Sequence, residues 1–171
     1  LVGDMAAPAL ALGHAFGRVG CFLNGCCFGY PSTGVASITY PGITADGMIN
    51  GPLYVQRQLG VIDPGATVCH SVVPIQLVSV AGNAALCALL LWCSTKPAWR
   101  GKLFALYLVV YAVMRFAIEF GRGDYLSRTW GLTSAQVLCL LLFPLGVAWL
   151  AAYRKLPSVL RLDTSSSGET A

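Results

Sequence analysis

Four long apolar stretches limit this chain to a small set of folds. They run over residues 1–17, 72–93, 103–120 and 135–153, and each approaches the roughly 20 residues that a helix needs to cross the core of a bilayer. The composition agrees, because 56% of the residues are hydrophobic and only 11% are charged, unlike a soluble domain. We therefore predict an all-α integral membrane protein, with about four transmembrane helices in a single membrane domain over residues 1–155.

The basic residues predict how these helices are oriented. Segment 94–102 carries three of them and the segment after Tyr153 carries three more, whereas the long segment 30–71 carries only Arg57. Because loops rich in lysine and arginine stay in the cytoplasm, residues 30–71 are expected to form an external loop between the first and second helices. Residues 156–171 are polar and predict a disordered cytoplasmic tail. These cations account for most of the net charge of +4, so no nucleic-acid partner is indicated.

The first apolar stretch is the weakest of the four. It is short and contains Pro8, Gly13 and His14, and the sequence begins at Leu1 without a methionine. We expect its helix to begin upstream, so that the chain represents a fragment or a truncated gene product.

A glycine-rich segment, GRVGCFLNGCCFG over residues 17–29, follows the first stretch. Glycines allow backbone N–H groups to turn toward an anion, and the guanidinium group of Arg18 provides a planar set of donors that suits phosphate. We expect a headgroup-binding loop here.

Charged residues also lie inside the third stretch, where they are costly and so indicate function. Arg115, Glu119 and Arg122 are spaced i, i+4, i+7, which predicts a single helix face. A buried ion pair that only orients helices is the structural alternative. However, two arginines around one carboxylate leave a net positive charge, which favours a phosphate ligand.

The seven cysteines fall into two groups. Cys87, Cys93 and Cys139 lie in or beside predicted helices and are interpreted as packing residues. The other four lie in segments predicted to be external, where a disulfide from Cys69 or a redox role is possible; they are Cys21, Cys26, Cys27 and Cys69. No metal site is predicted, because C-x4-CC matches no common zinc spacing. His14 and His70 are interpreted as structural, with proton acceptance as the alternative.

Two blocks of the sequence resemble the prolipoprotein diacylglyceryl transferase family of bacterial inner-membrane enzymes. GHAFGRVGCFLNGCCFG resembles the family signature, and MRFAIEFGRGDY resembles a second block in which an arginine, a glutamate and an arginine recur at this spacing. The order of the blocks and the later GLTSAQVLCLLL also fit, so the resemblance covers about residues 4–153.

The resemblance implies an activity and a set of site residues. The reaction would move the diacylglyceryl group of phosphatidylglycerol to the lipobox cysteine thiol of a prolipoprotein signal peptide, releasing glycerol phosphate without a cofactor. The site would face the periplasm or exterior, among membrane lipids. Arg18, Arg115 and Arg122 would bind the phosphate, and Glu119 would orient the arginines. The implied pocket would also use Asn24 and glycines; these glycines are Gly20, Gly25 and Gly29.

The chain also departs from the family pattern. The earlier helices of the family, with a histidine–glycine block, have no counterpart. VPIQLVS replaces a motif of the form HP-x-Q-L-Y-E, so that Val73, Val78 and Ser79 stand at its histidine, tyrosine and glutamate positions. Cys21 and Cys26 stand where some members have asparagine and glutamate. These departures keep two alternatives open: a non-catalytic protein that binds anionic lipid, and a cysteine-based redox or metal protein of the membrane.

Overall fold

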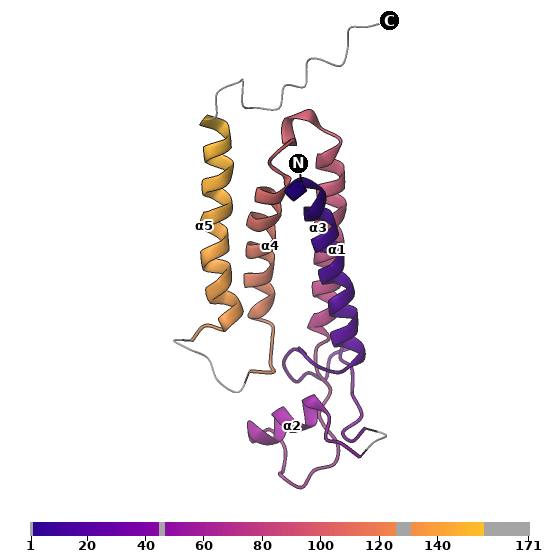
Figure 1. Cartoon of the computed structure of the whole chain (residues 1–171). Helices are drawn as coiled ribbons and strands as arrows, with labels where there is room; N and C mark the ends of the chain where they lie inside the picture. The colour runs from indigo at the N-terminus through magenta and orange to yellow at the C-terminus, as the bar shows by residue number, and fades with distance from the viewer. Residues whose placement is uncertain (1, 45–46, 126–130, 156–171) are drawn as a thin grey trace, which may run out of the picture.

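The computed structural model describes residues 2–44, 47–125 and 131–155, and its regular structure is helical (Figure 1). The elements are α1 (Val2–Leu23), α2 (Gly51–Gln58), α3 (Ile75–Ser94), the 3-10 helix η1 (Pro97–Trp99), α4 (Leu103–Glu119) and α5 (Ser134–Lys155). In these described ranges there are isolated β-bridges but no strand. The predicted all-α class is confirmed.

Three helices are long and apolar enough to cross a membrane, namely α1, α3 and residues 134–153 of α5. The protein is therefore a multi-pass membrane protein. Helix α4 has 17 residues, which gives about 25 Å at 1.5 Å per residue, somewhat less than the roughly 30 Å of the hydrocarbon core. It packs along α5 and also contacts α3 and α1 (Figure 1). The fourth crossing stays a prediction.

Helix α1 packs closely on α3 through small side chains. Ala7, Ala11 and Ala15 recur every four residues and are the buried residues of α1. Their small size lets the two backbones approach, as is common where helices meet in membranes. Larger apolar side chains of α1, such as that of Phe16, remain exposed, so they form a surface suited to lipid.

An acidic residue of α1 holds the start of α4. The Asp4 carboxylate accepts hydrogen bonds from the backbone N–H groups of Gly101 and of Leu103, the latter at 3.0 Å. A helix leaves its first N–H groups without partners, and a carboxylate there also faces the positive end of the helix dipole. Asp4 therefore ties the beginning of α1 to the beginning of α4.

Residues 24–44 and 47–74 form a folded cap at one end of the bundle (Figure 1). Its core contains Phe28, Tyr40, Val55 and Val72, and β-bridges join Val72 to Pro31 and Ile38. The sequence predicts a loop or a small cap over 30–71, and the structure has a cap whose helix α2 was not predicted.

The start of α2 carries signals that explain this helix. The Asn50 side chain accepts a hydrogen bond of 2.6 Å from the N–H of Gly51, and Pro52 follows in the first turn. Both are favoured at helix starts.

The segments predicted to lie on opposite sides of the membrane lie at opposite ends of the bundle. The cap and residues 121–125 lie at one end, and the N-terminus of α1 and η1 lie at the other (Figure 1). This arrangement agrees with the predicted pairing of segments. Which end faces the exterior stays a prediction, and the predicted tail over 156–171 lies outside the described residues.

Candidate functional site

The glycine-rich segment 17–29 is only partly a loop. Helix α1 continues to Leu23, so Arg18 and Gly20 are helical and the prediction of a loop from residue 17 is wrong. A helix satisfies its backbone hydrogen bonds internally, which favours its continuation even through glycines in a membrane. The backbone turns only after α1, where Gly25 and Cys27 adopt positive φ angles of 67° and 59°.

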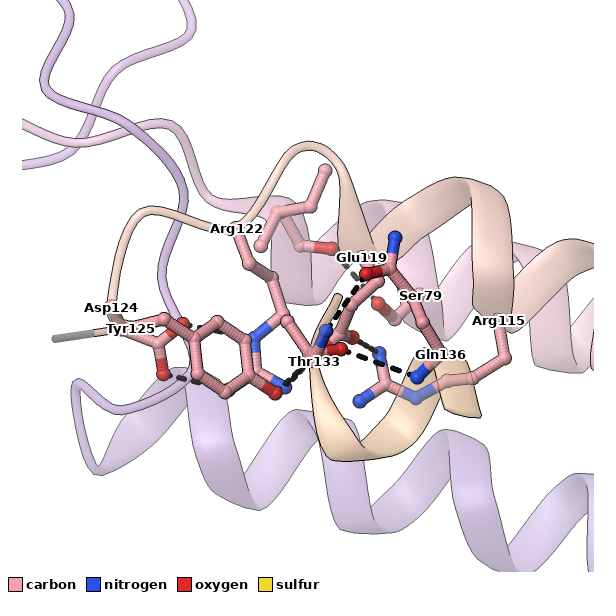
Figure 2. Close-up of polar contacts among 9 residues, drawn as sticks. Ser79, Arg115, Glu119, Arg122, Asp124, Tyr125, Thr133 and Gln136 are labelled. Carbon is pink, nitrogen blue, oxygen red and sulfur yellow. Dashed lines mark hydrogen bonds and ion pairs between the residues drawn. The ribbon is translucent and has the colours of Figure 1, made fainter. Parts of the chain in front are cut away.

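A network of four charged side chains lies at the end of α4 (Figure 2). Glu119 is fully buried and pairs with Arg115, one helical turn earlier. Its Oε1 also lies 3.4 Å from Nη1 of Arg122. Arg122 in turn donates two hydrogen bonds, of 2.9 and 2.6 Å, to the carboxylate of Asp124. The structure thus brings Arg115, Glu119 and Arg122 together.

Two details of this network differ from the sequence-based expectation. Helix α4 ends at Glu119, so Arg122 lies beyond the helix and reaches back to Glu119 instead of sharing its helix face. In addition, Asp124 balances the charge of Arg122. Two arginines and two carboxylates make the network neutral, and the expected net positive charge does not come from these residues.

Neighbouring groups enclose the network. The Tyr125 hydroxyl donates to the Glu119 carboxylate, and the Tyr125 ring lies 4.5 Å from the Arg122 guanidinium carbon. Thr133 and Gln136 form a capping box at the start of α5, with reciprocal hydrogen bonds of 3.0 and 3.2 Å. Figure 2 shows this capping box beside Glu119, so the beginning of α5 closes one side of the network.

Arg122 and Tyr125 lie just beyond the end of α4, and neighbouring groups shift the pKa of each. Burial lowers the pKa of Arg122, but the hydrogen bonds and charge of Asp124 outweigh this effect and raise the pKa overall. Burial, together with the hydrogen bond to Glu119, raises the pKa of Tyr125. The guanidinium therefore stays charged and the phenol stays a donor at neutral pH.

The end of the glycine-rich segment packs directly against the residues after α4. Gly29 and Arg122 form an antiparallel bridge, and the N–H of Gly123 donates to the carbonyl of Phe28 at 3.1 Å. A Cβ atom at Gly29 would lie 2.8 Å from the carbonyl oxygen of Val73, so the approach requires glycine. The two sequence blocks therefore meet at one end of the molecule.

A cavity of about 320 Å³ opens beside the network. Arg122 and Tyr125 line it from the side of α4, and Tyr30 and Gln56 are among its cap residues. The cavity therefore offers a charged guanidinium and a phenol to a small polar group.

The network is neutral, and Arg18 provides an additional positive charge near it. It lies close enough to His14 and Tyr111 for its charge to act on both, as does Arg115. Among the residues that the structure describes, Arg18 forms no ion pair. The ring of His14 stacks on Tyr111 with centroids 4.8 Å apart, and its Nδ1 lies 3.2 Å from the hydroxyl of Tyr107. An uncompensated cation thus faces the same region as Arg115.

The remaining predicted site residues are less closely associated with the network. Asn24 and Gly20 are exposed. Gly25 is buried, and a Cβ atom there would lie 3.1 Å from both Asn50 and Tyr40, so it packs within the cap. The structure explains Gly25 as a turn residue and, among the residues that it describes, gives no hydrogen bond between Asn24 and an arginine.

The cysteines fall into the two groups that their positions in the sequence predict. Cys87, Cys93 and Cys139 are buried in helices, and all seven cysteines are free thiols. Cys69 is buried in the cap and donates to the carbonyl of Tyr40 at 3.2 Å, so the suggested Cys69 disulfide is not present. The other three thiols form a cluster where α1 meets the cap, in which burial raises the pKa of Cys27 to about 11 although Arg122 opposes this effect.

Comparison with known proteins identifies the family. The model of the prolipoprotein diacylglyceryl transferase family matches residues 1–152. The chain belongs to this family. The phosphatidylglycerol–prolipoprotein diacylglyceryl transferase 2 of Clostridium perfringens is 30% identical over 148 residues, which cover 85% of this chain and 49% of that protein. The transferase of Dehalococcoides mccartyi is 37% identical over 146 residues, 84% of this chain and 48% of that protein.

A transferase of the same name from Xanthomonas oryzae pv. oryzae is 34% identical over 164 residues, 91% of this chain and 53% of that protein. The chain therefore spans about half the length of the curated relatives it matches. No solved structure matches it.

The sequence did not predict all the residues of the site in this member of the prolipoprotein diacylglyceryl transferase family. Asp124 and Tyr125 close the MRFAIEFGRGDY block, but nothing in their spacing shows that they turn back onto Glu119. Thr133 and Gln136 carry a readable signal, because T-x-x-Q before an apolar run is a capping box. That this helix start packs beside Glu119 depends on the tertiary fold and does not follow from the pattern.

Proposed function

We propose that this chain carries the lipid-binding and transfer site of a phosphatidylglycerol–prolipoprotein diacylglyceryl transferase. Relatives with that name match most of the chain. The observation that supports the proposal most is the buried network on Glu119. It holds two arginines, of which Arg122 lines a cavity, while Arg18 forms no ion pair with the residues that the structure describes. The substrates would be phosphatidylglycerol and the lipobox cysteine of a prolipoprotein signal peptide, and the released product would be glycerol phosphate.

The chemistry requires positive charge at the phosphate. The cysteine thiolate attacks the glycerol CH2 carbon of the diacylglyceryl group, the C–O bond to phosphate breaks, and the leaving glycerol phosphate gains a negative charge. Donors placed where this charge develops lower the barrier, the more so in a site that excludes water. Arg18 supplies the uncompensated charge, and Arg115 and Arg122 supply oriented guanidinium groups that bind phosphate.

Glu119 acts in this proposal as a positioning residue. It is fully buried and holds Arg115, Arg122 and the Tyr125 hydroxyl at once. Three long or rotatable side chains are thereby fixed before the lipid binds, which reduces the ordering cost of binding. Asp124 holds the far side of Arg122 in the same way.

The glycine-rich segment would form the path of the headgroup. No side chain fits at Gly29, so the backbone alone forms the wall of the site at this position. Asn24 and Gly20 are proposed to face the glycerol group, since both are exposed where α1 gives way to the cap, and Gly25 would shape the pocket through the turn that it makes. We place this end of the bundle at the periplasmic face of a bacterial inner membrane, because the opposite end carries Lys96, Arg100 and Lys102.

The test uses the 171-residue chain in vesicles of phosphatidylglycerol with a lipobox peptide, and mass spectrometry detects the thioether product. Arg18→Ala and Arg115→Ala are expected to abolish the product. Arg100→Ala serves as the matched control, because this arginine is exposed and belongs to the opposite end of the bundle. Product formation by Arg18→Ala at the wild-type rate would refute the proposed role of the arginine. Retention of phosphatidylglycerol by the wild-type chain without any product would support the non-catalytic alternative.

A further inference from the structure

Three thiols meet at the junction between α1 and the cap. The sulfur atoms of Cys21, Cys26 and Cys27 all lie within 4.8 Å of one another, and none is in a disulfide. All three residues are partly buried, so the cluster is shielded but can still be reached from outside. Such a group of soft ligand atoms is what zinc and other thiophilic ions bind.

The backbone that carries this cluster is well defined. The N–H of Cys26 donates to the carbonyl of Cys21 at 3.0 Å, which closes the turn after α1. Gln76, fully buried at the start of α3, donates from Nε2 to the carbonyl of Cys26 at 2.8 Å. Cys27 has a φ of 59° and is the one residue other than glycine with positive φ among those described. The left-handed conformation redirects the chain immediately after the second thiol.

Two arginines lie near the cluster. Arg18 and Arg122 both lie close enough to Cys27 for their charges to act on its sulfur. Three thiolates around a divalent cation carry a net charge of about −1, and nearby arginines stabilise that charge. The cluster therefore lies near two of the arginines that would hold the lipid phosphate.

We infer that Cys21, Cys26 and Cys27 bind a thiophilic d10 cation of the Zn²⁺ class and leave its fourth position open for the substrate thiol. Zn–S bonds of about 2.3 Å place sulfurs roughly 3.8 Å apart in a tetrahedron, so small side-chain movements suffice. Among the described residues no other histidine, cysteine or carboxylate joins the group. Three protein ligands with an open fourth position are typical of reactive rather than structural zinc sites.

The identity of the fourth ligand rests on the proposed function. Binding of the cation releases three protons from the cysteines. The substrate thiol then loses its own proton to solvent as its sulfur binds the cation, because a coordinating thiol is deprotonated. Its sulfur attacks the glycerol carbon, the C–O bond to phosphate breaks, and glycerol phosphate leaves with the bonding electrons. The product thioether is neutral and is a weaker ligand than the thiolate.

The first test needs no activity. The reduced, metal-free chain is titrated with Co²⁺ as an optical probe and then with Zn²⁺ as a competitor. A sulfur-to-cobalt charge-transfer band that saturates at one ion per chain is expected. Replacing Cys21, Cys26 and Cys27 together by serine should remove the band, while the four other cysteines remain as an internal control. A folded, fully reduced wild-type chain that shows no band would overturn the inference.

Single substitutions keep this test decisive if the triple variant does not fold. Each of Cys21→Ser, Cys26→Ser and Cys27→Ser should weaken binding about 100-fold or more, since even residues behind metal ligands cost 10–100-fold. Cys69→Ser should leave the affinity unchanged, because Cys69 lies apart from the cluster. Equal affinities for all four variants would contradict the assignment.

The second test separates this inference from the proposed function. A lipobox peptide is expected to change the Co²⁺ spectrum, and the same peptide with serine in place of its cysteine is not. An unchanged spectrum would overturn the open fourth position. Full transferase activity in the metal-free chain would refute a role of the cation but leave the transferase proposal intact. Conversely, cation and thiol binding without any transfer would refute the transferase proposal alone.

Discussion

Replacing the buried carboxylate at the centre of the network is expected to have a large and specific effect. Glu119 has no exposed surface and pairs with two arginines, and the side chain of Arg115 is itself only 12% exposed. Glu119→Gln preserves the shape but leaves both guanidinium groups against a neutral amide. Breaking a buried pair by removing one partner costs about 3–5 kcal/mol. Because Asp124 still pairs with Arg122, we expect a loss of about 3 kcal/mol, near the lower end.

A double-mutant cycle isolates the ion pair. The free energy of unfolding is measured for the wild type, Glu119→Gln, Arg115→Gln and the double variant, by circular dichroism during titration with a denaturing detergent in mixed micelles. The double variant should lose less stability than the two single losses combined, with a coupling energy of about 1–3 kcal/mol. Additive losses would refute the argument that Glu119 and Arg115 depend on each other.

Other substitutions test the packing, capping and titration of the fold. Gly29→Ala should destabilise the chain by about 1–3 kcal/mol in the same unfolding measurement, since the added Cβ meets the Val73 carbonyl, whereas Gly13→Ala, with open space around it, should be neutral or stabilising. Asp4→Ala should cost about 1–2 kcal/mol through the lost cap of α4, and Asp4→Asn should cost less; equal losses would argue against the charge. Burial raises the pKa of the Cys69 thiol above its ordinary 9.0, so the folded state is favoured while the thiol is protonated. Stability should then fall as the pH rises past 9.0, and Cys69→Ala should reduce this fall; an identical pH dependence in both chains would contradict the assignment.

The bundle was largely predictable from the sequence, whereas the ends of its helices were not. Apolar stretches gave the positions of α1, α3, α4 and α5 to within a few residues. The exception is the end of α1, which runs six residues past the predicted Gly17 because glycines that suggest a loop are tolerated in a membrane helix. Helix α2 was missed although Asn50 and Pro52 are recognisable starting signals.

The sequence predicted which residues of α4 come together, but not the charge balance around them. The spacing of Arg115 and Glu119 correctly indicated an ion pair. The return of Asp124 onto Arg122 depends on the turn after α4, which no periodic pattern describes. The sequence likewise placed three cysteines near one another without showing that their sulfurs converge, because this depends on the left-handed turn at Cys27.

The most direct test of the central claim follows both products of one reaction. Vesicles of phosphatidylglycerol, a lipobox peptide and the 171-residue chain are incubated together; phosphorus NMR measures released glycerol phosphate, and mass spectrometry measures the peptide thioether. If the arginines held around Glu119 support transfer, glycerol phosphate and thioether will appear in equal amounts with the wild type and will both be absent with Arg18→Ala. Glycerol phosphate released without thioether, or an unmodified peptide alongside tightly bound phosphatidylglycerol, would contradict the account.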